Sequence, residues 1–291
     1  MTGSRSVRSA AGRAPRRQRP AADPSAQSAR VPAQDRTTDS PAQRWSFPLW
    51  IAHRGAGKLA PENTLAAFRL GAQHGYRAFE CDVKLSADGV PFLLHDATLE
   101  RTTSGTGAAA DLAWSELSRL DAGGWHGRGF AGEPLPSLAG IAAYCLRNGF
   151  ALNIEIKPTP GAEVETGRVV ATEAARLWPG QALPPLLSSF QPEALMAARD
   201  AAPQLPRALL LDTLREGWFE QARALGCVAA VTNHRIMDAA LIAQLHDAGL
   251  RALVYTVNDA PEAQRLVALG IDGLITDAVD RFSPGPSGVR D

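Results

Sequence analysis

Beyond Trp45, short apolar runs alternate with longer amphipathic runs along almost the whole chain. Repeated alternation of strands and helices predicts a mostly parallel sheet with helices outside it. About eight such units in roughly 240 residues match the size of a (β/α)8 or TIM barrel, an α/β fold. The expected strands are residues 49–53, 78–83, 91–95, 151–156, 186–189, 207–211, 228–232, 252–257 and 273–276. The expected helices are residues 64–74, 138–148, 163–177, 192–201, 215–225, 238–248 and 261–269.

Two features disturb the alternation after the second expected strand. Only residues 84–90, with an Asp88-Gly89 turn, separate that strand from the third, which is too short for a parallel crossover and predicts a hairpin. The Gly-rich segment 97–136 then carries only a short helical run, at 114–119. We therefore expect a distorted barrel with a small insertion after the third strand. Such loops carry function, so the insertion is expected to cover the substrate pocket, with a tolerated surface insertion as the alternative.

The residues at the expected helix ends are of the types that such ends favour. Asn63 and Ser137 stand where N-terminal capping residues are expected. A glycine suited to the left-handed backbone conformation follows five of the helices, at Gly75, Gly149, Gly226, Gly249 and Gly270.

The first 45 residues differ in composition from the rest. Residues 1–45 contain nine Arg, no Lys and three Asp, and their lack of large apolar residues predicts a disordered extension. They also lack the apolar core of a secretory signal. An organelle transit peptide, a low-complexity extension and a start codon assigned too early remain open. We expect one barrel domain at 46–283 and a flexible tail at 284–291.

Charge and cysteine usage narrow the partners and the compartment. The formal net charge is zero, so no global field favours nucleic acid or a membrane surface. No stretch approaches the ~20 apolar residues of a membrane span. Cys81, Cys145 and Cys227 are widely spaced and odd in number, which excludes a simple disulfide framework. We therefore expect a cytoplasmic protein without nucleic-acid partners or stable membrane association.

Acidic residues stand on two of the expected strands. Side chains two residues apart on a strand share a face, so Glu80 and Asp82 point together, as do Glu155 and Lys157. Acids on the inner face of an apolar strand are costly unless they are paired or bind a metal. Three carboxylates converging from two strands suit Mg²⁺ or Ca²⁺. The alternative is that Glu155 and Lys157 pair with each other and with Arg54.

Two histidines end expected strands, and each precedes a charged residue. His53 is followed by Arg54, and His95 by Asp96. A lone histidine is more often structural, but near pH 7 a pair can divide the roles of general base and general acid. Arg54 and Lys157 are suited to bind phosphate, the first through its planar fork and the second as a point charge.

Several segments, taken in order from about residue 49 to 280, resemble one known family. They are HRG, PENTLAAF, ECDVKLSADG, LLHDATLERTTSGTG, GEPLPSL, NIEIKP, LLSSF, VYTVN and ITD. Together they resemble the glycerophosphodiester phosphodiesterases. Within that family the chain is most similar to the compact cytosolic bacterial enzymes associated with glycerol-3-phosphate uptake. The joint pattern is highly specific, although each fragment alone is weak.

The resemblance implies a distorted TIM barrel that hydrolyses glycerophosphodiesters to sn-glycerol 3-phosphate and an alcohol. The matching functional positions are the catalytic histidines His53 and His95, the metal carboxylates Glu80, Asp82 and Glu155, and the phosphate-binding cations Arg54 and Lys157. The implied cofactor is one divalent ion, Mg²⁺ foremost and Ca²⁺ or Mn²⁺ as alternatives. The implied partners are small-molecule glycerophosphodiesters.

Further pocket residues and other functions stay open at this point. Glu62 is a substrate-site candidate, and Phe190, Tyr255 and Trp125 are candidates to line the alcohol or glycerol pocket, or simply to pack. A lysophospholipase D or a phospholipase C-like enzyme on the same barrel is one alternative, although no basic amphipathic helix is evident. A non-catalytic protein that binds phosphate ligands is the other.

Overall fold

The computed structural model describes residues 47–181, 183–282 and 284. All of them fall in the second of the two units into which the chain divides, Ser40–Asp291. The expected disordered extension, 1–45, and all but the first residue of the expected tail, 284–291, lie outside the described residues. Within the described part, no helix is both long enough and apolar enough to cross a membrane.

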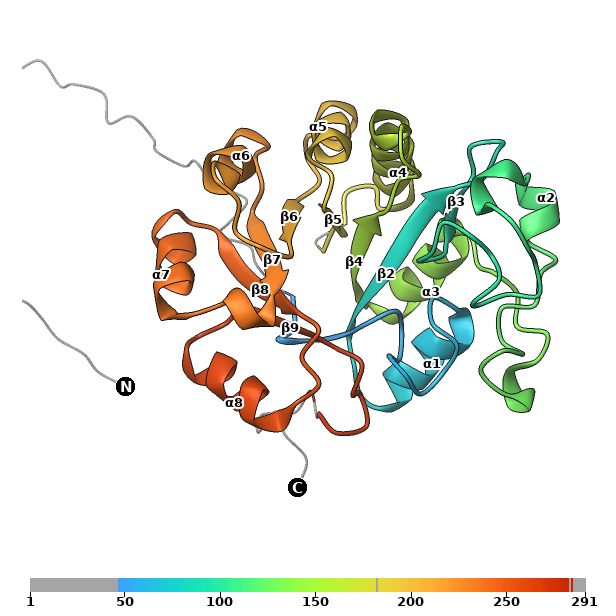
Figure 1. Ribbon diagram of the computed structural model, residues 1–291, viewed down its shortest axis with the longest axis horizontal. Helices are drawn as coiled ribbons and strands as arrows, with labels where there is room; N and C mark the ends of the chain where they lie inside the picture. The colour runs from blue at the N-terminus through green and yellow to red at the C-terminus, as the bar shows by residue number, and fades with distance from the viewer. Residues whose placement is uncertain (1–46, 182, 283, 285–291) are drawn as a thin grey trace, which may run out of the picture. The chain divides into compact units, whose positions relative to one another are not determined.

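The described strands form a closed parallel barrel with helices around it (Figure 1), so the expected TIM barrel is confirmed. Each barrel strand pairs in parallel with its neighbours, and β1 closes the ring by pairing with both β2 and β9. The barrel strands are β1 (Trp50–Ala52), β2 (Ala78–Leu85), β4 (Ala151–Ile156), β5 (Leu186–Ser189), β6 (Arg207–Leu211), β7 (Ala229–Asn233), β8 (Arg251–Tyr255) and β9 (Gly273–Thr276).

The remaining described strand, β3 (Pro91–Leu93), pairs with β2 and runs antiparallel to it. Val83 lies opposite Leu93 in this pair. The turn between the strands is closed by the amide of Gly89, which donates to the Ser86 carbonyl at 2.9 Å. Gly89 has φ 78°, a conformation that glycine adopts without strain. The expected hairpin is therefore confirmed.

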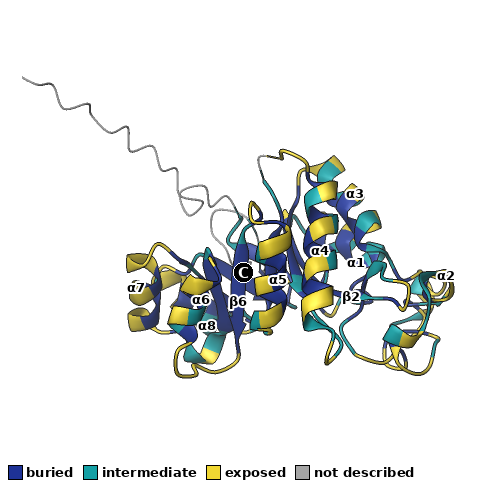
Figure 2. Ribbon diagram, turned by 90° about the horizontal axis from the view of Figure 1, so that it is seen from above, coloured by how far each residue is buried: buried dark blue, intermediate teal, exposed yellow. Residues whose placement is uncertain are grey.

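Seven helices of the described residues connect the strands and cover the barrel. Figure 2 shows exposed residues on the outer faces of α4 and α5 and buried residues on the faces toward the strands. The seven helices are α1 (Leu65–Gln73), α3 (Leu138–Asn148), α4 (Glu163–Leu177), α5 (Pro192–Ala201), α6 (Trp218–Ala224), α7 (Ala239–Asp247) and α8 (Ala260–Ala268).

One expected helix cap is wrong. Thr64, not Asn63, caps α1, because the Thr64 hydroxyl accepts a hydrogen bond from the Ala67 amide at 3.2 Å. Asn63 has a left-handed φ of 59° and directs its side chain to Asp82. The other expected cap, Ser137 on α3, is confirmed by its bond from the Gly140 amide.

The insertion 97–136 packs against β3 through a separate apolar cluster, which includes Phe92 and Leu94. It contains η2 (Ala109–Asp111), α2 (Trp114–Leu117) and η3 (Arg128–Phe130). Figure 1 shows α2 to the side of the barrel, beyond β3. That the insertion covers bound substrate stays a prediction.

Apolar side chains fill the barrel interior near the strand beginnings. Ile51, Ala78, Ala151 and Leu186 belong to this cluster. The polar residues of β2 and β4 stand farther along their strands, so the fold leaves the C-terminal end of the barrel for chemistry.

Candidate active site

Three carboxylates from neighbouring strands converge inside the barrel mouth. Asp82 on β2 is in register with Glu155 on β4, and Glu80 lies two residues before Asp82. One oxygen from each carboxylate lies within 4.8 Å of the others. Glu80 and Asp82 are buried and Glu155 is half-buried. The spacing of two places Glu80 and Asp82 on one face of β2, and the register between β2 and β4 brings Glu155 to the same point.

The electrostatics of this carboxylate cluster favour a cation. Burial, and then the charge of Asp82, raises the pKa of Glu80 to about 8. The same two causes raise the pKa of Glu155. Burial also opposes ionisation of Asp82, but the charges of Arg54 and Lys157 outweigh it and hold the pKa of Asp82 well below its usual range.

Two oxygens of the cluster lack hydrogen bonds. Glu80 Oε1 is buried and accepts none from the residues that the structure describes. Asp82 Oδ1 accepts none either, although the Lys157 ammonium lies 3.2 Å from it. Buried carboxylate oxygens are costly when left without partners. An all-oxygen set of three carboxylates is the chemistry that Mg²⁺ and Ca²⁺ prefer. The residues present therefore fit a divalent ion.

His53 follows β1 and is held in place from β9 and the loop after it. Its amide donates to the Thr276 carbonyl at 3.0 Å. Its Nδ1 lies 2.6 Å from Asp277 Oδ1, and its Nε2 lies 3.8 Å from Glu80 Oε2. Burial works to lower the pKa of His53, but the Asp277 hydrogen bond and the Glu80 charge outweigh it and raise that pKa.

His95 follows β3 and has the same kind of support. Its Nδ1 lies 2.6 Å from Asp96 Oδ1. Asp96 is held in turn by Arg101 of the insertion, whose Nε and Nη2 donate to it at 2.5 and 3.0 Å. Burial lowers the pKa of His95, and the nearby charge of Asp82 only partly offsets this.

Two cations stand against the carboxylate cluster. Arg54 Nε lies 3.2 Å from Asp82 Oδ2, and its Nη1 donates to Glu62 at 2.7 Å. Lys157 Nζ lies 2.9 Å from Glu155 and 3.2 Å from Asp82. The pairing of Glu155 with Lys157 considered above is thus present, but it occurs inside the cluster and not instead of it.

The backbone around Arg54 adopts sparsely populated conformations. Arg54 has φ 51°, and its amide donates to Glu80 Oε2 at 3.0 Å. A Cβ on Gly57 would lie 2.1 Å from the Asp277 carbonyl oxygen, so only glycine fits there. Strained backbone of this kind is concentrated at functional sites.

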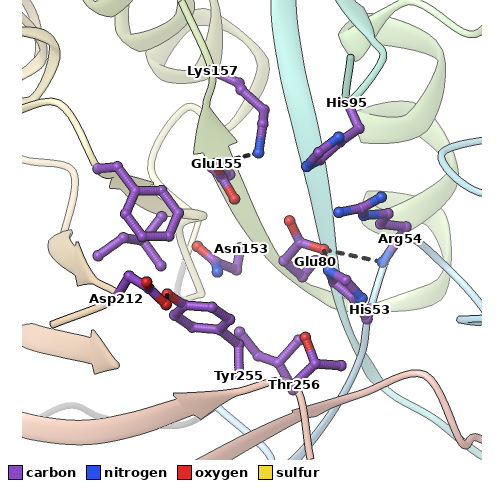
Figure 3. A pocket seen from close by; sticks show the side chains of 13 residues that line it. His53, Arg54, Glu80, His95, Asn153, Glu155, Lys157, Asp212, Tyr255 and Thr256 are labelled. Carbon is purple, nitrogen blue, oxygen red and sulfur yellow. Dashed lines mark hydrogen bonds and ion pairs between the residues drawn. The ribbon is translucent and has the colours of Figure 1, made fainter. Parts of the chain in front are cut away.

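One cavity of about 310 Å³ is lined by both histidines, both cations and the carboxylates Glu80 and Glu155. Figure 3 shows His53, Arg54 and His95 on one side of it, and Asp212 and Tyr255 on the other. Phe190 and Tyr255 meet edge to face with ring centroids 5.7 Å apart. This side therefore combines two aromatic rings with one carboxylate, since the Tyr255 hydroxyl donates to Asp212 at 3.4 Å.

Three candidates from the sequence lie outside the cavity lining. Asp82 is one of them, because its side chain is fully buried. Trp125 of the insertion is 42% exposed, and its indole N–H donates to the Ala122 carbonyl at 2.8 Å. Glu62 is engaged by arginines: besides Arg54, it accepts from Arg101 at 2.8 and 2.9 Å.

Sequence reasoning missed three supporting residues. Asp277 orients His53, and Arg101 links Glu62 to Asp96. Asn63 binds Asp82 twice, by donating from Nδ2 at 2.8 Å and by accepting from the Asp82 amide at 3.1 Å. All three lie in segments that carry the family resemblance, which was the one signal available for them.

Comparisons with known proteins agree with this geometry. The model of the glycerophosphoryl diester phosphodiesterase family matches residues 53–281. The Bacillus subtilis protein YhdW is 33% identical over 236 residues, which cover 79% of this chain and 94% of that protein. A glycerophosphodiester phosphodiesterase of Caldanaerobacter subterraneus is also 33% identical, over 79% of this chain and 93% of its own length.

A solved structure shows the same fold at similar identity. A phosphodiesterase of Oleispira antarctica, in complex with the product sn-glycerol-3-phosphate, superposes with a TM-score of 0.76. Its sequence is 35% identical, and the match covers 80% of this chain and 94% of that one.

Proposed function

Since the chain belongs to the glycerophosphoryl diester phosphodiesterase family, it is a phosphoric diester hydrolase, and we propose how its site works. It hydrolyses glycerophosphodiesters to sn-glycerol 3-phosphate and an alcohol, using one divalent ion and two histidines. The observation that carries this proposal is one cavity lined by His53, His95, Glu80 and Glu155. The relative from Oleispira antarctica, with sn-glycerol-3-phosphate bound, supports the product.

Glu80, Asp82 and Glu155 would hold the divalent ion. When bound, such an ion supplies positive charge beside the phosphoryl oxygens. Mg²⁺ is the ion we propose, with Ca²⁺ or Mn²⁺ as alternatives, since all three accept carboxylate oxygens. Arg54 and Lys157, which stand at the edge of the carboxylate cluster, would bind the phosphate oxygens and offset their charge.

The two histidines would move the protons. One takes the proton of the glycerol 2-hydroxyl as that oxygen attacks phosphorus, and the other protonates the oxygen of the leaving alcohol. Water then opens the resulting cyclic phosphate. Because Asp277 and Asp96 hold Nδ1 of His53 and His95, Nε2 is the nitrogen of each ring available for transfer.

Release of glycerol 3-phosphate from glycerophosphocholine tests this function. We expect His53→Ala and His95→Ala each to lower turnover ~100-fold or more, because general acid–base catalysis contributes about that much. EDTA should silence the wild-type enzyme, and Mg²⁺, Mn²⁺ or Ca²⁺ should restore it. Near-normal turnover in both folded variants would refute the roles proposed for the histidines. Activity that is unchanged by EDTA would refute the role proposed for the metal ion.

We also propose that the enzyme works in the cytoplasm. The support is cysteine usage: Cys81, Cys145 and Cys227 are each buried with a free thiol, as suits a reducing compartment. Cell fractionation with an antibody against the chain tests this, and recovery from an oxidising compartment would contradict it.

A further inference from the structure

A second cavity, of about 440 Å³, opens beside the first. The two cavities share the residues His95, Glu155, Lys157 and Phe190. A phosphodiester carries two arms, so a phosphate bound at the shared residues would direct one arm into each cavity. Only the first cavity is lined by His53 and Glu80, where the proposed function has the glycerol hydroxyl react. The second cavity is then left for the alcohol.

Lys84 is the cation of the second cavity that the mechanism does not use. It stands two residues beyond Asp82 on β2, and therefore on the same face. It is only 4% exposed. Its Nζ donates to the Lys157 carbonyl at 3.2 Å, and no described carboxylate lies within the 4.0 Å of an ion pair.

The other charged groups in the wall of this cavity are already paired. Asp96 binds Arg101 and His95, and Glu155 binds Lys157. Ser189 donates to the Ile156 carbonyl at 2.7 Å. An ammonium group has three N–H donors, and a buried cation without a counter-ion is costly. Lys84 therefore has N–H donors and a positive charge with which it can bind a ligand.

We propose that Lys84 selects the leaving alcohol, and that the second cavity prefers an alcohol carrying an anionic group such as a carboxylate. The proposal rests on the proposed function, which assigns the glycerol arm to the first cavity. A hydrogen bond from an ammonium to a carboxylate is charge-assisted and therefore stronger than one between neutral groups. A purely cationic alcohol would instead meet a like charge.

Glycerophosphoserine and glycerophosphoethanolamine are the matched substrates, because their alcohols differ only in the serine carboxylate. The measurement is kcat/KM for both esters with the Mg²⁺-loaded enzyme. We expect the wild type to prefer the serine ester about tenfold, the effect of one hydrogen bond to a charged group. Lys84→Met should bring the ratio to about 1, mainly through loss on the serine ester, and Lys84→Arg should keep a preference.

Lys58→Met is the control, because Lys58 is an exposed lysine that lines neither cavity. It should keep the wild-type ratio. Equal rates for the two esters in the wild type, or an equal loss on both in Lys84→Met, would overturn the proposal. The ratio of kcat/KM for the two esters in the wild type tests the proposal even if Lys84→Met does not fold. Hydrolysis without preference would leave the proposed function standing, whereas hydrolysis of neither ester would contradict both.

Discussion

Each of the two histidines proposed to be catalytic is hydrogen-bonded to its own carboxylate, but the two carboxylates are held differently. Asp277, which binds His53, comes from the end of β9 and is fixed by Asn258 at 3.0 Å. Asp96, which binds His95, is the next residue in the chain and is fixed by Arg101. Holding the ring orientation in this way limits the motion of the nitrogen that must reach the substrate.

Replacing Asp277 by Asn should therefore lower kcat with little change in KM. The expected loss is roughly 10- to 100-fold, as for other residues that orient a functional histidine. Steady-state kinetics on glycerophosphocholine, with the melting temperature as a check on folding, measures the effect. Asp280→Asn is the matched control, since Asp280 is exposed nearby. A rise in KM alone, or equal losses in the two variants, would contradict a positioning role for Asp277.

The parts of the site that could be predicted are those marked by a pattern within a short stretch of the sequence. The side chains of Glu80, Asp82 and Glu155 were predicted to converge because the alternation of faces along a strand is a local pattern. Asp277 could not be found in this way, since 224 residues separate it from His53. No strand or helix pattern near either residue indicates the contact between His53 and Asp277. It exists because the barrel closes β1 against β9.

At the scale of helices and strands, the turn and the strand spacing predicted the structure correctly, whereas one of the two predicted helix caps was wrong. The Asp88-Gly89 turn predicted the β2–β3 hairpin because so short a link allows few geometries. Asn63 and Thr64 are both good capping residues, so local chemistry could not choose between them. Tertiary structure decided, because Asp82 needs the Asn63 amide.

A polar cluster links helix α8 to the connection between β7 and α7, and its contribution to stability should depend on pH. Glu262 accepts from Arg265 at 2.8 Å and lies 2.8 Å from His234 Nδ1, in η4 (His234–Ile236). The hydrogen bond from Arg265 is the main reason that the pKa of Glu262 falls to about 2. A pKa depressed in the folded state gives stability that is present above the unfolded value, near 4.5, and is lost as the pH falls toward 2.

Glu262→Gln should accordingly lower the free energy of unfolding by about 1 kcal/mol at pH 7, a figure reduced for solvent screening of the pair. The difference from the wild type should shrink as the pH falls from 5 toward 2. Urea denaturation across this range measures it, with Glu220→Gln on the exposed face of α6 as the control. A difference that stays constant with pH would contradict the assignment.

At the scale of the whole described unit, the number and spacing of strand–helix units were enough to predict the barrel, because few arrangements bury so many parallel strands. The position of the insertion 97–136 in the sequence did not indicate which of its residues contact the site. Of its residues only Ala97 lines either cavity, yet Arg101 reaches both Glu62 and Asp96. Long side chains from a neighbouring segment leave no pattern in the sequence that strand or helix periodicity detects.

In the proposed mechanism, carboxylates from two barrel strands hold a single ion beside two histidines. Calorimetric titration of Mg²⁺ into metal-stripped protein tests it most directly. We expect one site per chain in the wild type, weakened at least about tenfold in Glu80→Gln and Glu155→Gln, and unchanged in Glu165→Gln on the exposed face of α4. Unaltered binding in the folded Glu80 and Glu155 variants, or no binding of Mg²⁺, Ca²⁺ or Mn²⁺ by the wild type, would contradict it.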